Sequence, residues 1–182
     1  MTRDADKMAR RVEVRDARLV DADRIAEVHV ASWQVAYRGL LPDPMLARML
    51  EQLLERQEFQ RHILETLGDR QRFLVAEADG VVIGFVHLGP TRDADSPDQG
   101  EIYAIYLDPA WYRRGVGREL FFRATQHLRD FGFRTAMLWV LRENDRARRF
   151  YESCGWRTDG GAKEERRELA TLHEVRYVTS LD

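Results

Sequence analysis

Short stretches in which hydrophobic and polar residues alternate recur along the chain and predict strands. Residues 12–15, where two valines alternate with charged residues, predict the first strand. Residues 73–78 and 81–88 predict a hairpin, because Asp79 and Gly80 between them supply the positive φ angles of a two-residue turn. Further apolar runs predict strands at 102–107, at 136–141 and, after a polar hairpin through Asp159, Gly160 and Gly161, at 175–178.

Apolar residues at helical spacing predict two helical stretches in the first half of the chain. Asp21 can cap the first helix, which ends before Gly39. Asp43 as a cap and Pro44 in the first turn predict a second helical stretch, which continues with a bend to Gly68.

Two more helices are predicted in the second half. Apolar residues at helical spacing over 116–128 indicate a helix that Gly132 closes. Asn144 or Asp145 can cap the last helix, which Gly155 ends. Strand and helix therefore alternate here, with short connections.

The composition fits a single soluble domain. With 182 residues and 44% hydrophobic residues, the chain can bury a continuous core without metals or disulfides. We expect residues 1–11 to form a flexible tail and residues 12–182 to form one domain. Residues 89–100 hold prolines and aspartates but no apolar period, which predicts a mobile surface loop. The charged first residues resemble neither a signal peptide nor a membrane anchor, so we expect a cytoplasmic protein without membrane contact.

Charge and cysteine content exclude several classes of function. The chain has 29 basic and 31 acidic residues, spread without a basic stripe, so nucleic acid is not an expected partner. No Cys/His spacing resembles a zinc site, and we expect no metal. The single cysteine, Cys154, has no base beside it in the sequence and is interpreted as a small packing residue.

A glycine-rich turn at the start of the third helix is the main candidate for chemistry. Residues 112–117 read Y-R-R-G-V-G, where a strand passes into a helix whose free backbone N–H groups and dipole attract anions. Gly115 and Gly117 let the backbone approach a diphosphate, and Arg113 and Arg114 add cationic donors. A tight turn that only needs glycine is the alternative. A dinucleotide fingerprint is excluded because Leu120 stands where it needs glycine or alanine, and the Gly-Lys-Ser/Thr of a P-loop is missing.

Two segments together resemble the GNAT superfamily of N-acetyltransferases. The first is 108–117, D-P-A-W-Y-R-R-G-V-G, which matches the family's Q/R-x-x-G-x-G/A loop except that Tyr112 stands at its first position. The second matches the family's N-x-x-A-x-x-F-Y-x-x-x-G-F block from Asn144 to Trp156, with Trp156 at the final aromatic position. The resemblance covers 12–181. It implies an α+β, α/β/α-layered fold with a mixed, mostly antiparallel sheet of about six or seven strands, splayed between its two central strands and flanked by about four helices.

The resemblance also implies a function. The family transfers an acetyl group from acetyl-coenzyme A to an amine, here the primary amine of a small molecule or a peptide N-terminus, by direct attack and without a metal. Many members pair through late strands, so a homodimer is compatible with it. The residues implied to bind coenzyme A are Ile105, Tyr106, Leu107, Tyr112, Arg113, Arg114, Gly115, Val116, Gly117, Arg118, Asn144, Arg148 and Tyr151.

The catalytic roles stay open between alternatives. Similar enzymes place a glutamate where Glu101 stands and use it as the base, whereas a solvated strand-end charge is the plain alternative. His29 and His87 are further candidates, because imidazole titrates near neutrality. The resemblance implies that Tyr151 hydrogen-bonds the departing sulfur, and the alternative is a core tyrosine. Asn144 contacts the cofactor arm, caps its helix, or does both.

The acceptor and even turnover are not determined by the sequence. A set of acidic residues could attract a cationic amine, although such charges are usually solvated; they are Asp93, Asp95, Asp98, Glu164, Glu165 and Glu168. A sensor domain that binds acyl-coenzyme A without turnover and an acyltransferase for longer acyl chains are the alternative functions.

Overall fold

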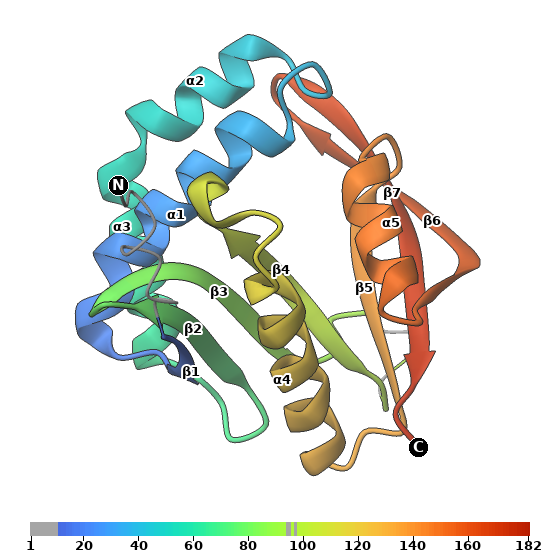
Figure 1. Cartoon of the computed structure of the whole chain (residues 1–182). Coiled ribbons are helices and arrows are strands. Elements are labelled where there is room, and N and C mark those ends of the chain that lie inside the picture. The colour runs from blue at the N-terminus through green and yellow to red at the C-terminus, as the bar shows by residue number, and fades with distance from the viewer. Residues whose placement is uncertain (1–10, 94–95, 97) are drawn as a thin grey trace, which may run out of the picture.

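Seven strands and five α-helices make up the described part of the chain (Figure 1). The computed structural model describes residues 11–93, 96 and 98–182. In chain order the elements are β1 (Val12–Asp16), the 3-10 turn η1 (Leu19–Asp21), α1 (Ala22–Ala36), α2 (Asp43–Glu51), α3 (Leu53–Glu65), β2 (Arg72–Ala78), β3 (Val81–Pro90), β4 (Gly100–Leu107), the 3-10 turn η2 (Pro109–Trp111), α4 (Val116–Asp130), β5 (Thr135–Leu141), α5 (Asp145–Ser153), β6 (Arg157–Arg167) and β7 (Ala170–Ser180).

The strands form one mixed sheet in the order β1-β2-β3-β4-β5-β7-β6. Every neighbouring pair is antiparallel except β4 and β5, which are parallel. The predicted mixed, mostly antiparallel sheet is therefore confirmed. The predicted hairpin turn is also confirmed, since Asp79 and Gly80 have φ angles of 51° and 78°.

A bulge in β4 and an early end to its pairing with β5 open the sheet. His87 pairs with Ala104 and Leu88 with Ile102, so Tyr103 is one extra residue in β4. Such a bulge bends a strand and increases its twist. The pairing of β4 with β5 covers only Gly100 with Ala136 and Glu101 with Met137. Beyond these pairs the two strands diverge toward α1 and α2, as Figure 1 shows. The splayed sheet implied by the resemblance is thus present.

The helices cover both faces of the sheet. Helices α4 and α5 lie over one face, where Phe121 and Tyr151 join the apolar core around β5. Helices α1 and α3 lie against the other face, where Ile25 and Val28 pack on Phe73 and Phe85. The predicted second helical stretch is divided at Gln52 into α2 and α3, which accounts for its expected bend. This division gives five helices where about four were expected.

The late hairpin turns at a different place from the one predicted. Strand β6 runs through residues 159–161, and the chain reverses only between Arg167 and Ala170. Residues 159–161 instead form a bulge, because the register jumps from Thr158 opposite Tyr177 to Ala162 opposite Val175. The prediction was wrong because a glycine with positive φ serves a bulge as well as a turn.

Two predicted helix caps and several boundaries also differ. Asp21 precedes α1 but its side chain does not cap this helix, because its carboxylate accepts hydrogen bonds from Arg15 (2.7 Å) and, within the turn η1, from the Arg18 amide (2.7 Å). Helix α2 begins at Asp43 itself, after Pro42, so Asp43 is not a cap. The predicted loop 89–100 is shorter than expected, because β3 and β4 pair as far as Pro90 and Gly100. Positions 94, 95 and 97 of this loop, and all but Arg11 of the predicted tail, lie outside the described residues.

Candidate active site

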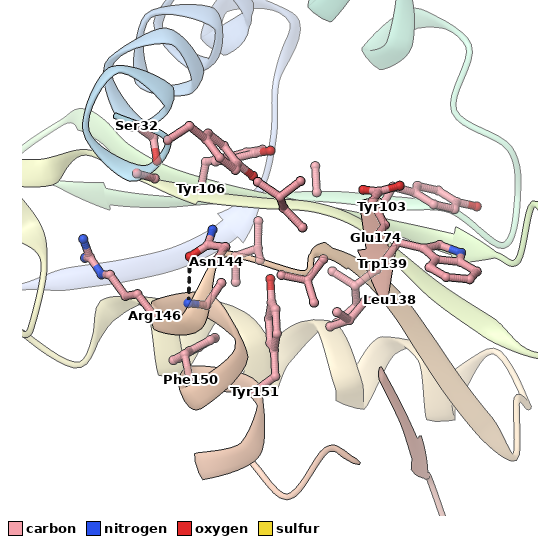
Figure 2. Close-up of a pocket in the computed structure, with 18 of the residues that line it drawn as sticks. Ser32, Tyr103, Tyr106, Leu138, Trp139, Asn144, Arg146, Phe150, Tyr151 and Glu174 are labelled. Atoms are coloured by element: carbon pink, nitrogen blue, oxygen red, sulfur yellow. Dashed lines mark hydrogen bonds between the residues drawn. The ribbon is translucent and has the colours of Figure 1, made fainter. Parts of the chain in front are cut away.

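A cleft of about 920 Å³ lies where β4 and β5 diverge, bounded by α1, the start of α4, α5 and β7 (Figure 2). It brings together residues that are far apart in the sequence. The predicted site residues that line it are Glu101, Ile105, Tyr106, Leu107, Tyr112, Arg113, Gly115, Gly117, Arg118, Asn144 and Tyr151.

One end of the cleft is the start of α4, which is shaped to receive an anion. Arg113 and Gly115 have φ angles of 62° and 83°, which turn the chain sharply into the helix. No side chain of the described residues caps this end, and the first backbone hydrogen bond of the helix runs from the Glu119 amide to the Gly115 carbonyl (3.1 Å). The three amides before it lack partners in the helix, as the first amides of a helix do. A Cβ on Gly117 would have no described atom within 4 Å apart from its chain neighbours and the backbone of its own helix, so the space in front of these amides is open.

Three predicted residues do not line the cleft. The Arg114 guanidinium lies over the Trp111 ring at 4.9 Å, and Val116 is buried in the core. Arg148 donates to the Tyr177 hydroxyl (3.2 Å) and to the Arg142 carbonyl (3.0 Å). Helical geometry explains why Arg148 does not line the cleft. Positions 146 and 148 on α5 are separated by about 200° around the helix axis, so their side chains lie on opposite faces. Arg146 on α5 lines the cleft instead.

Tyr112, at the position where the family usually has Gln or Arg, ties the turn to neighbouring elements. Its hydroxyl lies 3.2 Å from the Ser32 hydroxyl on α1, and the Arg146 guanidinium lies 3.9 Å from its ring centroid. The tyrosine therefore links α1, the turn and α5 across the mouth of the cleft.

Tyr151 projects from α5 into the middle of the cleft, as Figure 2 shows. The helix is positioned by Asn144, whose side chain accepts a hydrogen bond from the Ala147 amide (3.1 Å), so the predicted cap is confirmed. Tyr151 is 8% exposed, and burial raises the pKa of its hydroxyl above the usual value of 10.0. The phenol is therefore protonated at neutral pH and can donate a hydrogen bond into the cleft.

Glu101 lies at the closed end of the cleft, where β4 and β5 still pair. Its side chain is buried and accepts hydrogen bonds from the Arg92 amide (2.8 Å) and the Arg92 guanidinium (2.5 Å). It is therefore not a solvated strand-end charge. The ion pair compensates the burial of a carboxylate, which without a partner would be costly.

The two candidate histidines lie in a second cavity of about 730 Å³ between β3, β4 and the helices α1 to α3. Burial lowers the pKa of His29 to about 3 and that of His87 to about 4. Both imidazoles are neutral at pH 7 and are weak proton acceptors. The two cavities meet along β4, because Arg92, Tyr103, Ala104 and Tyr106 line both of them, as do Trp33 and Arg167.

The buried histidines predict acid destabilisation. A histidine titrates near 6.5 in the unfolded chain, so between pH 6.5 and about 4 the unfolded chain binds more protons than the folded one. The free energy of unfolding therefore decreases as the pH is lowered through this range. At pH 5 each histidine should contribute a loss of about 2 kcal/mol relative to pH 7. Denaturant unfolding of His87→Gln should show a correspondingly smaller loss over this window. His62→Gln, at an exposed position on α3, is the control, and equal losses in both variants would contradict the assignment.

Comparison with known proteins decides the family. Residues 27–156 match the model of the acetyltransferase (GNAT) family. The chain belongs to this family. It is 33% identical to the uncharacterised N-acetyltransferase YuaI of Bacillus subtilis over 133 residues, 73% of each chain. It is also 24% identical to a spermidine N(1)-acetyltransferase of Thermoplasma acidophilum over 153 residues, covering 82% of this chain and 92% of the relative.

Solved structures of N-acetyltransferases share the fold of this chain. The PaiA N-acetyltransferase of Thermoplasma acidophilum in complex with coenzyme A superposes with a TM-score of 0.71 at 22% identity, over 90% of this chain and 98% of that one. YncA of Salmonella typhimurium with acetyl-coenzyme A gives a TM-score of 0.65 at 22% identity, over 94% and 95%. The resemblance inferred from the two motifs and its class of enzyme, an acyltransferase, are confirmed.

One acidic residue in the cleft of this GNAT enzyme, Glu174, was not predicted from the sequence. Glu174 on β7 lines the cleft (Figure 2), is 19% exposed and lies 3.4 Å from the Lys163 ammonium. The predicted last strand, 175–178, begins one residue after it. A prediction that extended this strand toward its start, as β7 does, would have placed Glu174 on the same face as Leu172 and Arg176.

The remaining observations concern Cys154, metal ions and membrane-spanning helices. Burial raises the pKa of the Cys154 thiol, and the residue packs against the core, as predicted. Within the described residues, no group of three or more His, Cys, Asp or Glu side chains could hold a metal ion. No described helix is both long and apolar enough to cross a membrane.

Proposed function

We propose that this GNAT enzyme transfers the acetyl group of acetyl-coenzyme A to a primary amine of a small molecule or a peptide N-terminus. The single observation that carries the proposal is the cleft of the split sheet, which has an open anion-binding helix end at one side and the Tyr151 hydroxyl in its middle. The relatives include a spermidine N(1)-acetyltransferase and a mycothiol acetyltransferase, of whose length the chain spans 92% and 32%, and these names support a small acceptor.

The residues at the start of α4 fit the diphosphate of coenzyme A. Its oxygens can accept from the free amides of residues 116–118, and the open space at Gly117 admits them. The Arg113 and Arg118 side chains line the same end and add positive charge. When bound, acetyl-coenzyme A supplies an activated thioester.

The free edge of β4 can hold the pantetheine arm and polarise the thioester. Its pairing with β5 has ended, so a peptide-like arm can add to this edge as a further strand. The Asp108 amide donates to Ile83 of β3, and amides alternate in direction along a strand. The Leu107 amide, and not that of Tyr106, therefore points away from β3 and is the donor we propose for the carbonyl oxygen.

The remaining chemistry is proton movement. A lysine-like amine with a pKa near ~10.4 is mostly protonated at neutral pH, and removing its proton costs roughly 4 to 5 kcal/mol. We propose that Glu101 accepts this proton, directly or through water, because it lines the cleft, whereas the two histidines line the second cavity and not the cleft. Tyr151 donates a hydrogen bond to the departing sulfur.

The proposal is tested by mixing the protein, acetyl-coenzyme A and a panel of amines and measuring the free thiol released. Release that requires both the amine and the protein, with the acetylated amine found by mass spectrometry, is the expected result. Tight binding of acetyl-coenzyme A with no release for any amine would instead indicate a sensor without turnover.

Replacing Glu101 with Gln should lower kcat/KM at pH 7 by roughly 10- to 100-fold, with recovery at higher pH as more amine is free. The amide can still accept from the Arg92 backbone, so the loop contact is largely kept. Arg92→Gln is the matched control, because it removes the charge partner and keeps the carboxylate. Equal losses in the two variants, with unchanged pH profiles, would mean that the ion pair is structural.

A further inference from the structure

The second cavity, which adjoins the thioester cleft along β4, is lined by an excess of positive charge. Four arginines line it, and Glu168 is its one carboxylate among the described residues. Three of these arginines have partners: Arg48 pairs with Glu168 (2.6 Å), Arg92 with Glu101 (2.5 Å) and Arg167 with Glu165 (2.7 Å). The fourth, Arg56 on α3, carries the charge that the cavity leaves uncompensated.

Arg56 is held in an unfavourable position. It is half-buried, and its Nε atom has no hydrogen-bond partner within the described part of the chain. Burial and the neighbouring cation Arg167 lower the pKa of Arg56, and Glu55 offsets this in part. Two guanidinium groups from α3 and from the tip of the β6–β7 hairpin thus face one cavity. An anion between them would compensate the charge of Arg56 and could also accept from Arg167, whose Nη2 atom pairs with Glu165, since guanidinium groups bind carboxylate and phosphate through two parallel hydrogen bonds.

The walls around the two arginines have further polar atoms without partners. Gln60 is 4% exposed, and its Oε1 atom has no hydrogen-bond partner among the described residues, nor do His29 Nδ1 and His87 Nε2. Buried polar atoms normally have partners, and exceptions call for an explanation such as a ligand or water. The rings of Phe73 and Phe85 complete the floor. The cavity therefore fits a compact molecule with both apolar and polar parts.

The acidic residues considered as attractors of a cationic amine do not create a negative pocket. Glu164, Glu165 and Glu168 are exposed and pair with His173 (3.3 Å), Arg167 (2.7 Å) and Arg48 (2.6 Å). Asp93 accepts from Trp139 (3.1 Å), Asp98 is exposed, and Asp95 lies outside the described residues.

We propose that the second cavity binds the acceptor and that the acceptor is an amine carrying an anionic group, a carboxylate or a phosphate, which Arg56 and Arg167 hold. This inference rests on the proposed acetyl transfer and adds the acceptor class to it. The amine end of the acceptor then lies toward Tyr103 and Tyr106, where the two cavities meet. A polyamine is disfavoured in this cavity, because it would add positive charge beside two arginines.

Matched acceptors test the proposal in steady-state assays. We would compare α-, β- and γ-amino acids with their amides and with the corresponding aminoalkyl phosphonates, in the wild type and in Arg56→Gln and Arg167→Gln. The wild type should prefer one class of anionic acceptor over the matched amide in kcat/KM. Each variant should reduce this preference at least about tenfold, mainly through KM, as expected when a charged hydrogen bond is lost. Arg61→Gln, on the same helix but paired with Asp23 and outside the cavity, is the control and should keep the preference.

Product binding gives a readout that does not need turnover. The N-acetylated form of an anionic acceptor should bind the wild type more tightly than the N-acetylated amide, and Arg56→Gln should abolish the difference. Equal binding of the two products, or equal kcat/KM for acids and amides, would overturn the inference while leaving acetyl transfer standing. Absence of thiol release with every amine would overturn the proposed function itself.

Discussion

A Tyr151→Phe enzyme is expected to turn over roughly 100 to 1,000 times more slowly than the wild type, as is typical when a positioned proton donor is removed. The affinity for acetyl-coenzyme A should change little, because the helix end that fits the diphosphate is separate from this side chain. The hydroxyl projects into the cleft, and its pKa is raised by burial, so it is a donor throughout the neutral range. Stopped assays of thiol release, with binding of acetyl-coenzyme A measured by calorimetry, check both parts.

Tyr177 provides a matched control for this experiment. Its ring lies 6.1 Å from that of Tyr151, it is fully buried, and its hydroxyl donates to Glu152 (2.6 Å) without lining the cleft. Tyr177→Phe should therefore lower stability by about 1 kcal/mol and leave kcat nearly unchanged. If Tyr151→Phe behaves in the same way as Tyr177→Phe, Tyr151 is only a core residue.

Local features of the fold were predictable where one residue type has one structural use. The hairpin at Asp79 and Gly80 follows from the need for positive φ, and the cap at Asn144 follows from its place before an apolar helix. Gly160 did not distinguish a hairpin turn from a bulge, because both can use a positive φ, and here it lies in a bulge inside β6. The splay of the sheet came from the family resemblance, since the bulge at Tyr103 leaves no mark in the hydrophobic pattern.

The candidate site was predictable only in its backbone part. The turn before α4 is contiguous in sequence, so its motif showed both the glycines and the free amides. The side-chain contacts join distant segments. The pairing of Glu101 with Arg92 depends on how the 91–99 loop returns, and the facing of Arg56 and Arg167 depends on the position of the β6–β7 tip. The spacing of residues along a single sequence does not show that such distant positions lie close together.

Replacing Gly117 with Val should weaken acetyl-coenzyme A binding at least about 100-fold, as expected when two or more charge-assisted hydrogen bonds are lost. The side chain would enter the open space in front of the free amides, where the diphosphate is proposed to lie. The fold should tolerate it, since the new Cβ meets no described atom within 4 Å beyond its chain neighbours and its own helix backbone, and valine is a better helix residue than glycine. The thermal midpoint should therefore be unchanged or slightly higher.

Two further glycine variants separate blocking from strain. Gly117→Ala adds one methyl group at the same place and should weaken binding less than valine does. Gly115→Ala acts through the backbone, because its φ of 83° is unfavourable for alanine and should cost roughly 1 to 2 kcal/mol of stability. Calorimetric titration with coenzyme A and with pantetheine, which lacks the diphosphate, distinguishes the contacts: valine at 117 should weaken only the binding of coenzyme A. Equal weakening of both ligands would place the diphosphate elsewhere and remove the main support for the proposed cofactor site.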